Sequence, residues 1–294
     1  MTGLHGFTGR YLADLLLEAG HDVHGLVRAT DEADRNRHVT MHVSDLLDVE
    51  RTAAIVREVR PDYVIHLAGV AFVAHDDVDE MYRTNILGTR SLLAACAGSV
   101  GGLRAVLVAS SANVYGNAHG GTLTEDTPIR PANDYGVTKA AAEQLAAIYG
   151  AELPVIVARP FNYTGVGQNE SFLVPKIVSC LKRHAPIVEL GNLDVARDFS
   201  DVRMVVDAYL RMLEHPDAVG ATFNICSGEA ISVRDVVARA SQIAGREIEV
   251  TISPDVVRVN DVQCLRGSRE KLERVIGPLK SIPLEETLRW MMGS

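Results

Sequence analysis

The sequence predicts an α/β fold, a doubly wound parallel sheet with a smaller mixed α/β lobe added to it. Three observations predict this fold. Apolar runs rich in Val, Ile, Leu and Ala alternate with amphipathic segments through the first half of the chain, which is typical of a parallel sheet covered on both faces. A glycine-rich loop at the start leads directly into a helical pattern. After Arg159 the chain changes to shorter segments with clustered Pro, Gly and Asn.

The predicted elements follow the chain in order. Four continuous apolar runs have the length and composition of buried strands: Asp22–Val27, Tyr63–Leu67, Ala105–Ala109 and Pro154–Ala158. Amphipathic segments between them predict covering helices at Tyr11–Ala19, Asn85–Ala97 and Gly136–Tyr149. Beyond Arg159 we expect helices and two short strands, at Phe172–Arg183, Val202–Glu214, Val233–Ala244, Ile187–Leu190 and Thr222–Cys226.

Composition excludes several classes of function. The chain has 294 residues and a net charge of −9, so it gains nothing from counterion release on DNA or RNA, and we expect no nucleic-acid partner. A phosphate-bearing substrate stays possible, because local Arg and Lys can make a positive cleft on an acidic body. The four cysteines form no CxxC pair, and we assign no metal and no disulfide framework. With no signal peptide and no apolar run that could span a bilayer, we expect a cytoplasmic protein without a membrane partner.

The opening loop has the spacing of a phosphate-binding turn. Gly3-Leu4-His5-Gly6-Phe7-Thr8-Gly9 is a GxxGxxG loop followed by a helix. The glycines let the backbone approach a pyrophosphate, and the helix N-terminus offers free N–H groups. Such a loop alone is also explained as a Gly-rich turn before a helix. We interpret residues 1–160 as a dinucleotide-binding domain and residues 161–294 mainly as a substrate lobe, with a segment near 200–228 returning to the first domain.

Arg28 indicates which dinucleotide is bound. The predicted strand Asp22–Val27 ends at Arg28, where a site for NAD usually has an acidic residue. An Arg at this position can receive the 2′-phosphate of NADP, so NADP is favoured and NAD remains possible; the alternative is a solvated surface Arg. The loop should follow a strand, yet only Met1 and Thr2 precede Gly3. We therefore expect the first strand of the sheet to be missing or severely shortened.

Two further motifs carry the candidate chemistry. Tyr135-Gly136-Val137-Thr138-Lys139 is a YxxxK arrangement, which places both side chains on one helix face. We expect the ammonium group to lower the pKa of the tyrosine, which could then exchange a proton with a sugar hydroxyl. Ser110-Ser111-Ala112-Asn113-Val114-Tyr115-Gly116 follows a predicted strand, and ligands gather at the carboxyl ends of parallel strands. Either motif alone also occurs by chance on helices and turns.

Taken together, these motifs resemble those of the extended short-chain dehydrogenase/reductase family, also called the NAD-dependent epimerase/dehydratase family. The resemblance covers nearly the whole chain and implies a Rossmann fold. It rests on the glycine loop, Asp45-Leu46, His66-Leu67-Ala68-Gly69, Asn85-Ile86-Leu87-Gly88-Thr89, Ser111 with Val114-Tyr115-Gly116, Tyr135 with Lys139, and Arg159-Pro160-Phe161-Asn162.

The resemblance also implies residue roles. Tyr135 would be the acid/base, Lys139 would hold the nicotinamide ribose, and Ser111 would polarise the substrate oxygen. The other cofactor-binding positions would be those of the matched motifs, namely Gly3, His5, Gly6, Phe7, Thr8, Gly9, Arg28, Asp45, Leu46, Leu67, Ala68, Gly69, Asn85 and Arg159.

Asn113 narrows the expected reaction. Dehydratases of the family have an acidic residue at this position, and an amide cannot act as a base at neutral pH. Motifs in the second half, such as Arg197-Asp198-Phe199 and Asn224-Ile225-Cys226-Ser227-Gly228, resemble the branch that acts on GDP-mannose. We therefore expect NADPH-dependent reduction of the 4-keto group of a nucleotide-linked 6-deoxy-hexose, GDP-4-keto-6-deoxy-mannose to GDP-rhamnose. The alternatives are a 4-epimerase with bound NAD, a 4,6-dehydratase, and a non-catalytic NADP-binding protein.

The second lobe supplies the candidate substrate contacts. A guanidinium can bind phosphate with two hydrogen bonds, so Arg197 and Arg258 are candidates for the diphosphate; a surface ion pair explains either Arg equally well. The full predicted set is Ser111, Asn113, Asn162, Val174, Lys176, Arg197 and Arg258.

The resemblance further implies a homodimer built on a four-helix bundle from Asn85–Ala97 and Gly136–Tyr149. Small residues on these helices, among them Ala94, Ala95, Ala140, Ala141, Ala146 and Ala147, would let helices approach closely. The alternative is that these alanines face the sheet of their own subunit.

Overall fold

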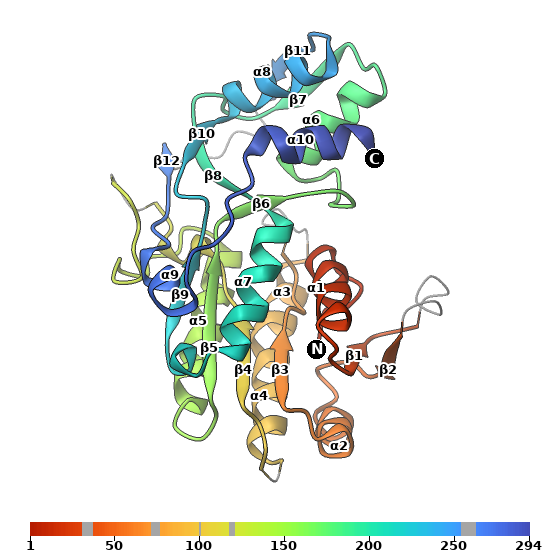
Figure 1. Ribbon diagram of the computed structural model, residues 1–294, viewed down its shortest axis with the longest axis vertical. Coiled ribbons are helices and arrows are strands. Elements are labelled where there is room, and N and C mark those ends of the chain that lie inside the picture. Colours follow the sequence, from red (N-terminus) through yellow and green to blue (C-terminus); the bar gives the residue numbers. More distant parts are fainter. Residues whose placement is uncertain (31–37, 72–76, 100, 118–120, 254–262) are drawn as a thin grey trace.

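The computed structural model describes residues 1–30, 38–71, 77–99, 101–117, 121–253 and 263–294. Figure 1 shows a lower body built on a parallel sheet and an upper lobe of short strands and helices. The elements follow in chain order: α1 Phe7–Glu18, β1 Val23–Val27, β2 Val39–Val43, α2 Val49–Val59, β3 Tyr63–His66, α3 Val78–Tyr82, the π-helical turn η2 Arg83–Gly88, α4 Thr89–Ala97, β4 Ala105–Ala109, η3 Ala112–Tyr115, α5 Asp134–Tyr149, β5 Val155–Pro160, β6 Asn162–Thr164, α6 Leu173–Lys182, β7 Ile187–Leu190, β8 Ala196–Asp201, α7 Val202–Glu214, η4 Pro216–Ala218, β9 Thr222–Ile225, β10 Ala230–Ser232, α8 Val233–Ala244, β11 Glu249–Ile252, β12 Cys264–Leu265, α9 Glu270–Ile276 and α10 Leu284–Gly293.

The body is a parallel sheet between two helical layers. Strands β3, β4, β5 and β9 pair in this order, all parallel. Side chains alternate along each strand, so on β4 Ala105 and Leu107 join the core beneath α1 and α7, whereas Val106 and Val108 join the core beneath α2, α4 and α5. Because both faces are covered, the strands are apolar throughout. The predicted doubly wound α/β fold is confirmed.

The two residues before the glycine loop lie between β1 and β3. Thr2 forms parallel bridges with Leu26 of β1 and with His66 of β3. Its amide donates to the carbonyl of Ile65 at 2.9 Å, and the carbonyl of Met1 accepts from the amide of Leu26 at 2.8 Å. The pair β1 and β2 is thereby joined to the main sheet by two residues.

Several element boundaries differ from the prediction. The predicted helix Asn85–Ala97 begins earlier and starts with the π-helical turn η2, which runs directly into α4. Strand β2, helix α2 and strand β8 were not assigned from the sequence, because each lies next to polar or charged residues that weaken its apolar pattern. Helices α7 and α8 have the predicted bounds.

The upper lobe has its own core. Strand β8 pairs with β6, β10 and β12, and β7 pairs with β11. Apolar residues of α6, α8 and α10, including the fully buried Ile177, Val236 and Leu288, pack together beside these strands. Helix α7 covers the main sheet and strand β9 lies in it beside β5, so the chain returns to the body directly after β8.

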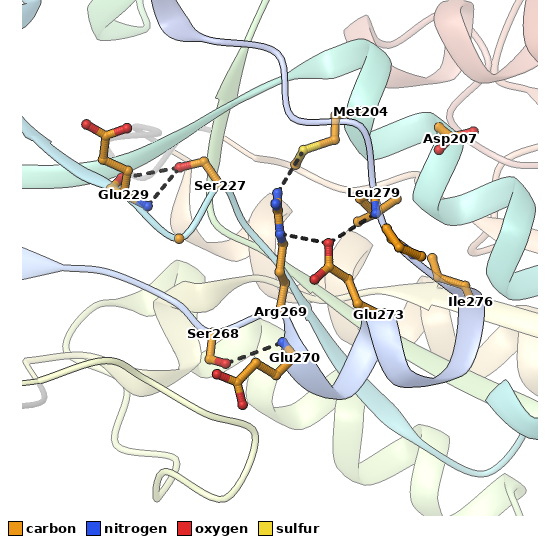
Figure 2. Close-up of polar contacts among 12 residues, drawn as sticks. Met204, Asp207, Ser227, Glu229, Ser268, Arg269, Glu270, Glu273, Ile276 and Leu279 are labelled. Atoms are coloured by element: carbon orange, nitrogen blue, oxygen red, sulfur yellow. Dashed lines mark hydrogen bonds and ion pairs between the residues drawn. The ribbon is translucent and has the colours of Figure 1, made fainter.

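Polar contacts at the start of helix α9 join it to helix α7 of the body. Arg269 lies between Met204 of α7 and Glu273 (Figure 2). Its Nε is 3.1 Å from Glu273 Oε1, which also accepts from the amide of Leu279 at 3.1 Å. These contacts join α9 to α7 and fix the segment that leads to α10.

Helices α4 and α5 pack side by side on the body. Ala95 and Ala146 are buried against their own sheet, whereas Leu87, Val137 and Ile148 are exposed large apolar side chains on η2 and α5. In the described ranges, no helix is both long and apolar enough to cross a membrane.

Candidate active site

A cavity of about 830 Å³ lies at the carboxyl ends of β4 and β5, lined by residues of both the body and the upper lobe. Parallel α/β sheets bind ligands at this edge. Most of the predicted site residues line it, namely Gly3, Gly6, Phe7, Thr8, Gly9, Leu67, Gly69, Ser111, Asn113, Tyr135, Lys139, Asn162, Val174 and Arg197.

The glycine loop is shaped so that only glycine fits. Gly3 has φ +73°, and a Cβ there would lie 2.7 Å from the amide nitrogen of Ala68. A Cβ on Gly9 would lie 2.1 Å from the carbonyl oxygen of Gly3. The backbone of the loop is therefore open to the cavity at the start of α1, whose first turn contains no acidic residue. This arrangement fits a dinucleotide pyrophosphate.

Thr2 and His66 hold the glycine loop against the loop that follows β3. The Oγ1 of Thr2 lies 2.8 Å from His66 Nδ1 and accepts from the amide of Ala68 at 3.1 Å. His66 Nε2 lies 2.9 Å from the hydroxyl of Thr89. Burial lowers the pKa of His66 to about 3, so the ring is neutral and acts as a spacer between two hydroxyls.

Tyr135 and Ser111 meet at the cavity. Tyr135 is in the first turn of α5, where Asn133 caps the helix by accepting from the amide of Gly136 at 2.8 Å. Ser111 caps η3 and accepts from the amide of Asn113 at 3.2 Å and from its side-chain nitrogen at 3.1 Å. Burial raises the pKa of Tyr135, and a hydrogen bond with Ser111 opposes this.

Lys139 lies one helical turn beyond Tyr135, as predicted. Its Nζ donates to the carbonyl of Ala109 at 2.8 Å and lies 5.8 Å from the centre of the Tyr135 ring. Burial lowers the pKa of Lys139 to about 8, while the Glu143 carboxylate raises it. The expected lowering of the tyrosine pKa by the ammonium group is not what the structure shows, because loss of solvation dominates at both residues.

Asn85 links two segments that border the cavity. Its Oδ1 accepts from the amide of Val70 at 2.8 Å, and its Nδ2 donates to the carbonyl of Val70 at 3.1 Å and to the hydroxyl of Thr138 at 3.0 Å. Asn85 thus ties the loop after β3 to helix α5. It belongs to the π-helical turn, a local geometry that is frequent at functional sites.

Arg159 is part of a buried network beneath the cavity. Its Nε and Nη2 donate to the two carboxylate oxygens of Glu143 at 2.8 and 2.6 Å, and its Nη1 donates to the Tyr115 hydroxyl at 2.9 Å. That hydroxyl donates to Asn224 Oδ1 at 2.6 Å, and Ser110 donates to Glu143 at 2.5 Å. Arg159 therefore joins β5, α5, η3 and β9, and its guanidinium is engaged by the protein itself.

Five other predicted cofactor positions do not line the cavity in the described part of the chain. Arg28 is exposed at the end of β1, with 76% of its side chain accessible, and pairs with Glu80 at 3.4 Å. Asp45 accepts from the amide of Leu47 at 2.9 Å, and Leu46 packs in the core near Gly88. His5 and Ala68 are next to cavity residues in the chain. The amide of Ala68 donates a hydrogen bond to the hydroxyl of Thr2.

The upper lobe contributes side chains that the sequence did not point to. Tyr163 lies 2.8 Å from the Thr8 hydroxyl and stacks on Phe7 with ring centroids 6.0 Å apart. Other such cavity residues of the upper lobe are Gln168, Phe172 and Phe199, and Tyr209 of α7 lines the cavity from the body. The predicted Lys176 on α6 does not line the cavity, and Arg258 lies outside the described residues.

The cavity is positive in charge. Its charged side chains in the described part of the chain are Lys139 and Arg197, and no Asp or Glu lines it there. Arg197 Nη1 donates to the carbonyl of Ala196 at 2.9 Å. A cavity of this kind favours anionic ligands over cationic ones.

Comparison with known proteins agrees with this geometry. The GDP-6-deoxy-D-mannose reductase of Pseudomonas aeruginosa is 35% identical, with 100% of this chain and 95% of that protein covered. A candidate epimerase from Burkholderia cenocepacia J2315 is 50% identical and superposes with a TM-score of 0.92, over 99% of this chain and 95% of that one. The structure of RMD from Pseudomonas aeruginosa complexed with NADPH is 33% identical with a TM-score of 0.83, over 99% and 96% of the two chains.

A family match settles the classification. Residues 1–226 match the NAD dependent epimerase/dehydratase family. With its glycine loop and its Ser111, Tyr135 and Lys139 at one cavity, the chain belongs to this family and is an NAD(P)-dependent enzyme of the short-chain dehydrogenase/reductase type.

Proposed function

We propose that the protein uses NADPH to reduce the 4-keto group of a nucleotide-linked 6-deoxy-hexose, with GDP-4-keto-6-deoxy-mannose as substrate and GDP-rhamnose as product. The 35% identity to GDP-6-deoxy-D-mannose reductase and the likeness to a structure complexed with NADPH support this choice. The observation that carries it is the lining of the cavity. A tyrosine, a serine and a lysine are present there, and an amide stands where a dehydratase needs a carboxylate.

Ser111 and Tyr135 would act on the carbonyl oxygen of the sugar. Bound NADPH would supply the hydride. The Tyr135 hydroxyl would donate its proton to the oxygen as negative charge develops there, and Ser111 would hold that oxygen by a hydrogen bond. The raised pKa of Tyr135 keeps its hydroxyl protonated at neutral pH, as a proton donor must be. Lys139 would hold the nicotinamide ribose beside it.

The lack of a carboxylate weighs against dehydration. A 4,6-dehydratase must remove the proton beside the keto group, and this requires a base. Asn113 cannot be that base, and among the described residues that line the cavity none carries a carboxylate or an imidazole. Lys139 is held by the carbonyl of Ala109. Reduction needs only a hydride and a proton donor, roles that the proposal gives to NADPH and to Tyr135.

We extend the proposal to the residues that would bind the cofactor and the nucleotide part of the substrate. The glycine loop would bind the dinucleotide pyrophosphate, and the exposed guanidinium of Arg28 would receive the 2′-phosphate of NADPH. Arg197 would bind the nucleotide diphosphate of the substrate with charge-assisted hydrogen bonds. Asn162, Tyr163 and Phe172 would surround the sugar and base from the upper lobe.

The direct test follows NADPH absorbance at 340 nm with GDP-4-keto-6-deoxy-mannose, and with the dTDP analogue in parallel. We expect oxidation of NADPH with the GDP substrate and a loss of at least about 100-fold in kcat for Tyr135→Phe, since one proton-transfer group typically contributes 10²–10⁴-fold. NADH replaces NADPH in a further series. Absence of NADPH oxidation with both sugars, in a protein that binds NADPH, would contradict the proposal and favour a 4-epimerase.

A further inference from the structure

Two hydroxyl groups meet where the upper lobe contacts the start of helix α1. The hydroxyl of Tyr163, on strand β6, lies 2.8 Å from the Oγ1 of Thr8, in the first turn of the helix. The two residues are 155 positions apart in the chain, and both line the main cavity. This contact therefore places a phenol group of the upper lobe beside the loop that we expect to bind the cofactor pyrophosphate.

The side chain of Tyr163 is held from several sides. Its ring stacks on the ring of Phe7, with centroids 6.0 Å apart and an angle of 16° between the planes. Its backbone pairs with Ser200 of β8, and its carbonyl accepts from the side-chain nitrogen of Gln168 at 3.1 Å. Because Phe7 and Thr8 are consecutive, one turn of α1 contacts both the face and the hydroxyl of the tyrosine. These contacts direct the hydroxyl at Thr8.

A second tyrosine joins α1 to the same segment of the upper lobe. The Tyr11 hydroxyl donates to the carbonyl of Val166 at 2.6 Å, and the Tyr11 ring lies edge-on to Phe7 with centroids 5.6 Å apart. Tyr11 is not among the described residues that line the cavity. It stabilises the same junction from outside the cavity, which makes it a matched control for Tyr163.

The backbone around Thr8 favours an anion. Phe7, Thr8 and Gly9 form the first turn of α1, where helix geometry leaves the backbone amides without a partner inside the helix. These amides and the positive end of the helix dipole attract a phosphate group. Because the chain belongs to a family of dinucleotide-dependent enzymes, the cofactor pyrophosphate is the anion that this turn would hold.

The chemistry of a phosphate decides how the two hydroxyls must point. An ionised phosphate oxygen can only accept a hydrogen bond, whereas a hydroxyl donates one proton and accepts on its lone pairs. If Thr8 donates to the phosphate, its oxygen remains free to accept from Tyr163. The two bonds then form a chain in which each polarises the other, and the bond to the charged oxygen is the stronger of the two.

The protonation state of Tyr163 suits this direction. Burial raises the pKa of its hydroxyl, and the hydrogen bond with Thr8 opposes this. The phenol therefore keeps its proton at neutral pH and can donate it. In the described part of the cavity lining there is no Asp or Glu, so no carboxylate there competes for either proton.

We propose that Tyr163 is a positioning residue for the cofactor, which orients the Thr8 hydroxyl so that it donates a hydrogen bond to the pyrophosphate of the bound dinucleotide. The upper lobe then takes part in cofactor binding, and Tyr163 acts on the cofactor only through Thr8. The inference requires a dinucleotide but not the proposed sugar reduction. It applies to NADPH and NADH alike, because both contain the pyrophosphate.

The test measures the dissociation constant of NADPH for variants that each remove one hydroxyl. Thr8→Val and Tyr163→Phe keep the shape of the side chain, and Tyr163→Phe keeps the stack on Phe7. Thr8→Ser retains the hydroxyl, and Tyr11→Phe is the control at the junction. Binding is followed by fluorescence of the reduced nicotinamide, and melting temperatures show that each variant is folded. A protein that prefers NADH is tested with NADH in the same series.

We expect Thr8→Val to weaken NADPH binding by about tenfold or more, because it removes a hydrogen bond to a charged group. Tyr163→Phe should weaken binding by roughly 2–10-fold, the range for one neutral hydrogen bond. Thr8→Ser should stay within about threefold of the parent chain, since it keeps a donor at the same position. Tyr11→Phe should change the affinity by less than about twofold, since no cavity residue loses a partner.

The double variant separates positioning from general support. Because Tyr163 acts through the Thr8 hydroxyl, Tyr163→Phe should cause no further loss of affinity in the Thr8→Val background. Losses that add would show that Tyr163 supports the site independently of Thr8, and this would overturn the proposal. Equal losses for Tyr163→Phe and Tyr11→Phe would also overturn it, because the effect would then belong to the junction as a whole.

A fragment of the cofactor identifies the group that Thr8 contacts. The compound 2′-phospho-ADP-ribose contains the pyrophosphate but no nicotinamide, and its binding is measured by calorimetry. Thr8→Val should weaken the fragment by the same factor as NADPH. Weaker binding of NADPH alone would place the contact at the nicotinamide end and overturn the assignment to the pyrophosphate, and so would unchanged binding of both ligands. None of these measurements uses a sugar substrate, so they remain valid if the proposed reduction is not observed.

Discussion

Removing the negative charge of Glu143 tests whether the buried network beneath the cavity holds the body together. Glu143 and Arg159 are 6% and 5% exposed, and they form two parallel hydrogen bonds of 2.8 and 2.6 Å. In Glu143→Gln the guanidinium keeps its charge and its bond to Tyr115 but faces a neutral amide. The variant therefore has a buried positive charge on Arg159 with no negative charge beside it. Because this charge is shielded from solvent, salt should not screen its destabilising effect.

The expected loss of unfolding free energy is about 3–5 kcal/mol, the range measured when one partner of a buried pair is removed. For a chain of this size, that loss lowers the melting temperature by roughly 5–10 °C. Replacing both partners by apolar residues of similar volume should restore most of the loss, because the guanidinium is then no longer buried without a partner. The double variant Glu143→Met with Arg159→Met should therefore be more stable than either single variant.

The assay is urea unfolding at pH 7, followed by far-ultraviolet circular dichroism. The matched control is Glu285→Gln, which breaks an ion pair with Arg239 that is also 2.6 Å long but has side chains 33% and 37% exposed. That change should alter stability by no more than about 1 kcal/mol. Equal losses for Glu143→Gln and Glu285→Gln would refute the reasoning, and so would a double variant less stable than both singles.

Three further predictions concern the cavity. The pKa of Lys139 is lowered from 10.5 to about 8 in the folded chain, so the unfolded chain binds more protons between these values and stability should rise by about 3 kcal/mol from pH 8 to pH 10.5. In Lys139→Met, the unfolding free energy measured in urea should no longer show this rise between pH 8 and pH 10.5, and activity at pH 7 should be lost. An unchanged rise would show that Lys139 is not the group that titrates. Gly9→Ala places a Cβ 2.1 Å from the Gly3 carbonyl oxygen, so NADPH binding measured by calorimetry should be lost, while an ordinary dissociation constant would show that the loop tolerates the change. Arg28→Ser should raise the KM for NADPH about tenfold or more and leave that for NADH unchanged, whereas equal effects on both would argue against 2′-phosphate recognition.

The sequence was sufficient to predict the positions of residues that local spacing brings together. Tyr135 and Lys139 are one helical turn apart, and Ser111 follows a strand directly. Once the parallel sheet is assumed, these short-range patterns place all three at the same edge, where the structure has them. The glycine loop was recognised for the same reason, because its turn and its helix are adjacent in the chain.

The support of the site could not be predicted in this way. Tyr115 bonds to Asn224, 109 residues further along the chain, and Thr2 contacts His66, 64 residues away. Such pairs depend on which strands become neighbours. Arg159 and Leu46 belong to recognised motifs, but the structure uses one in a buried ion pair and the other in the core. A motif therefore identifies positions that the fold needs. It does not tell whether the residue contacts a ligand or supports the scaffold.

The burial that makes these supports necessary also sets the chemistry of the site. The same loss of solvation raises the pKa of Tyr135 and lowers that of Lys139, so both residues are pushed toward their neutral forms. For the tyrosine, the neutral form is the one that can donate a proton to a developing alkoxide. For the lysine, the Ala109 carbonyl and the Glu143 carboxylate counteract the loss of charge. Glu143 thus acts on two levels, because the carboxylate that neutralises Arg159 in the scaffold also favours the charged form of the lysine beside the reacting tyrosine.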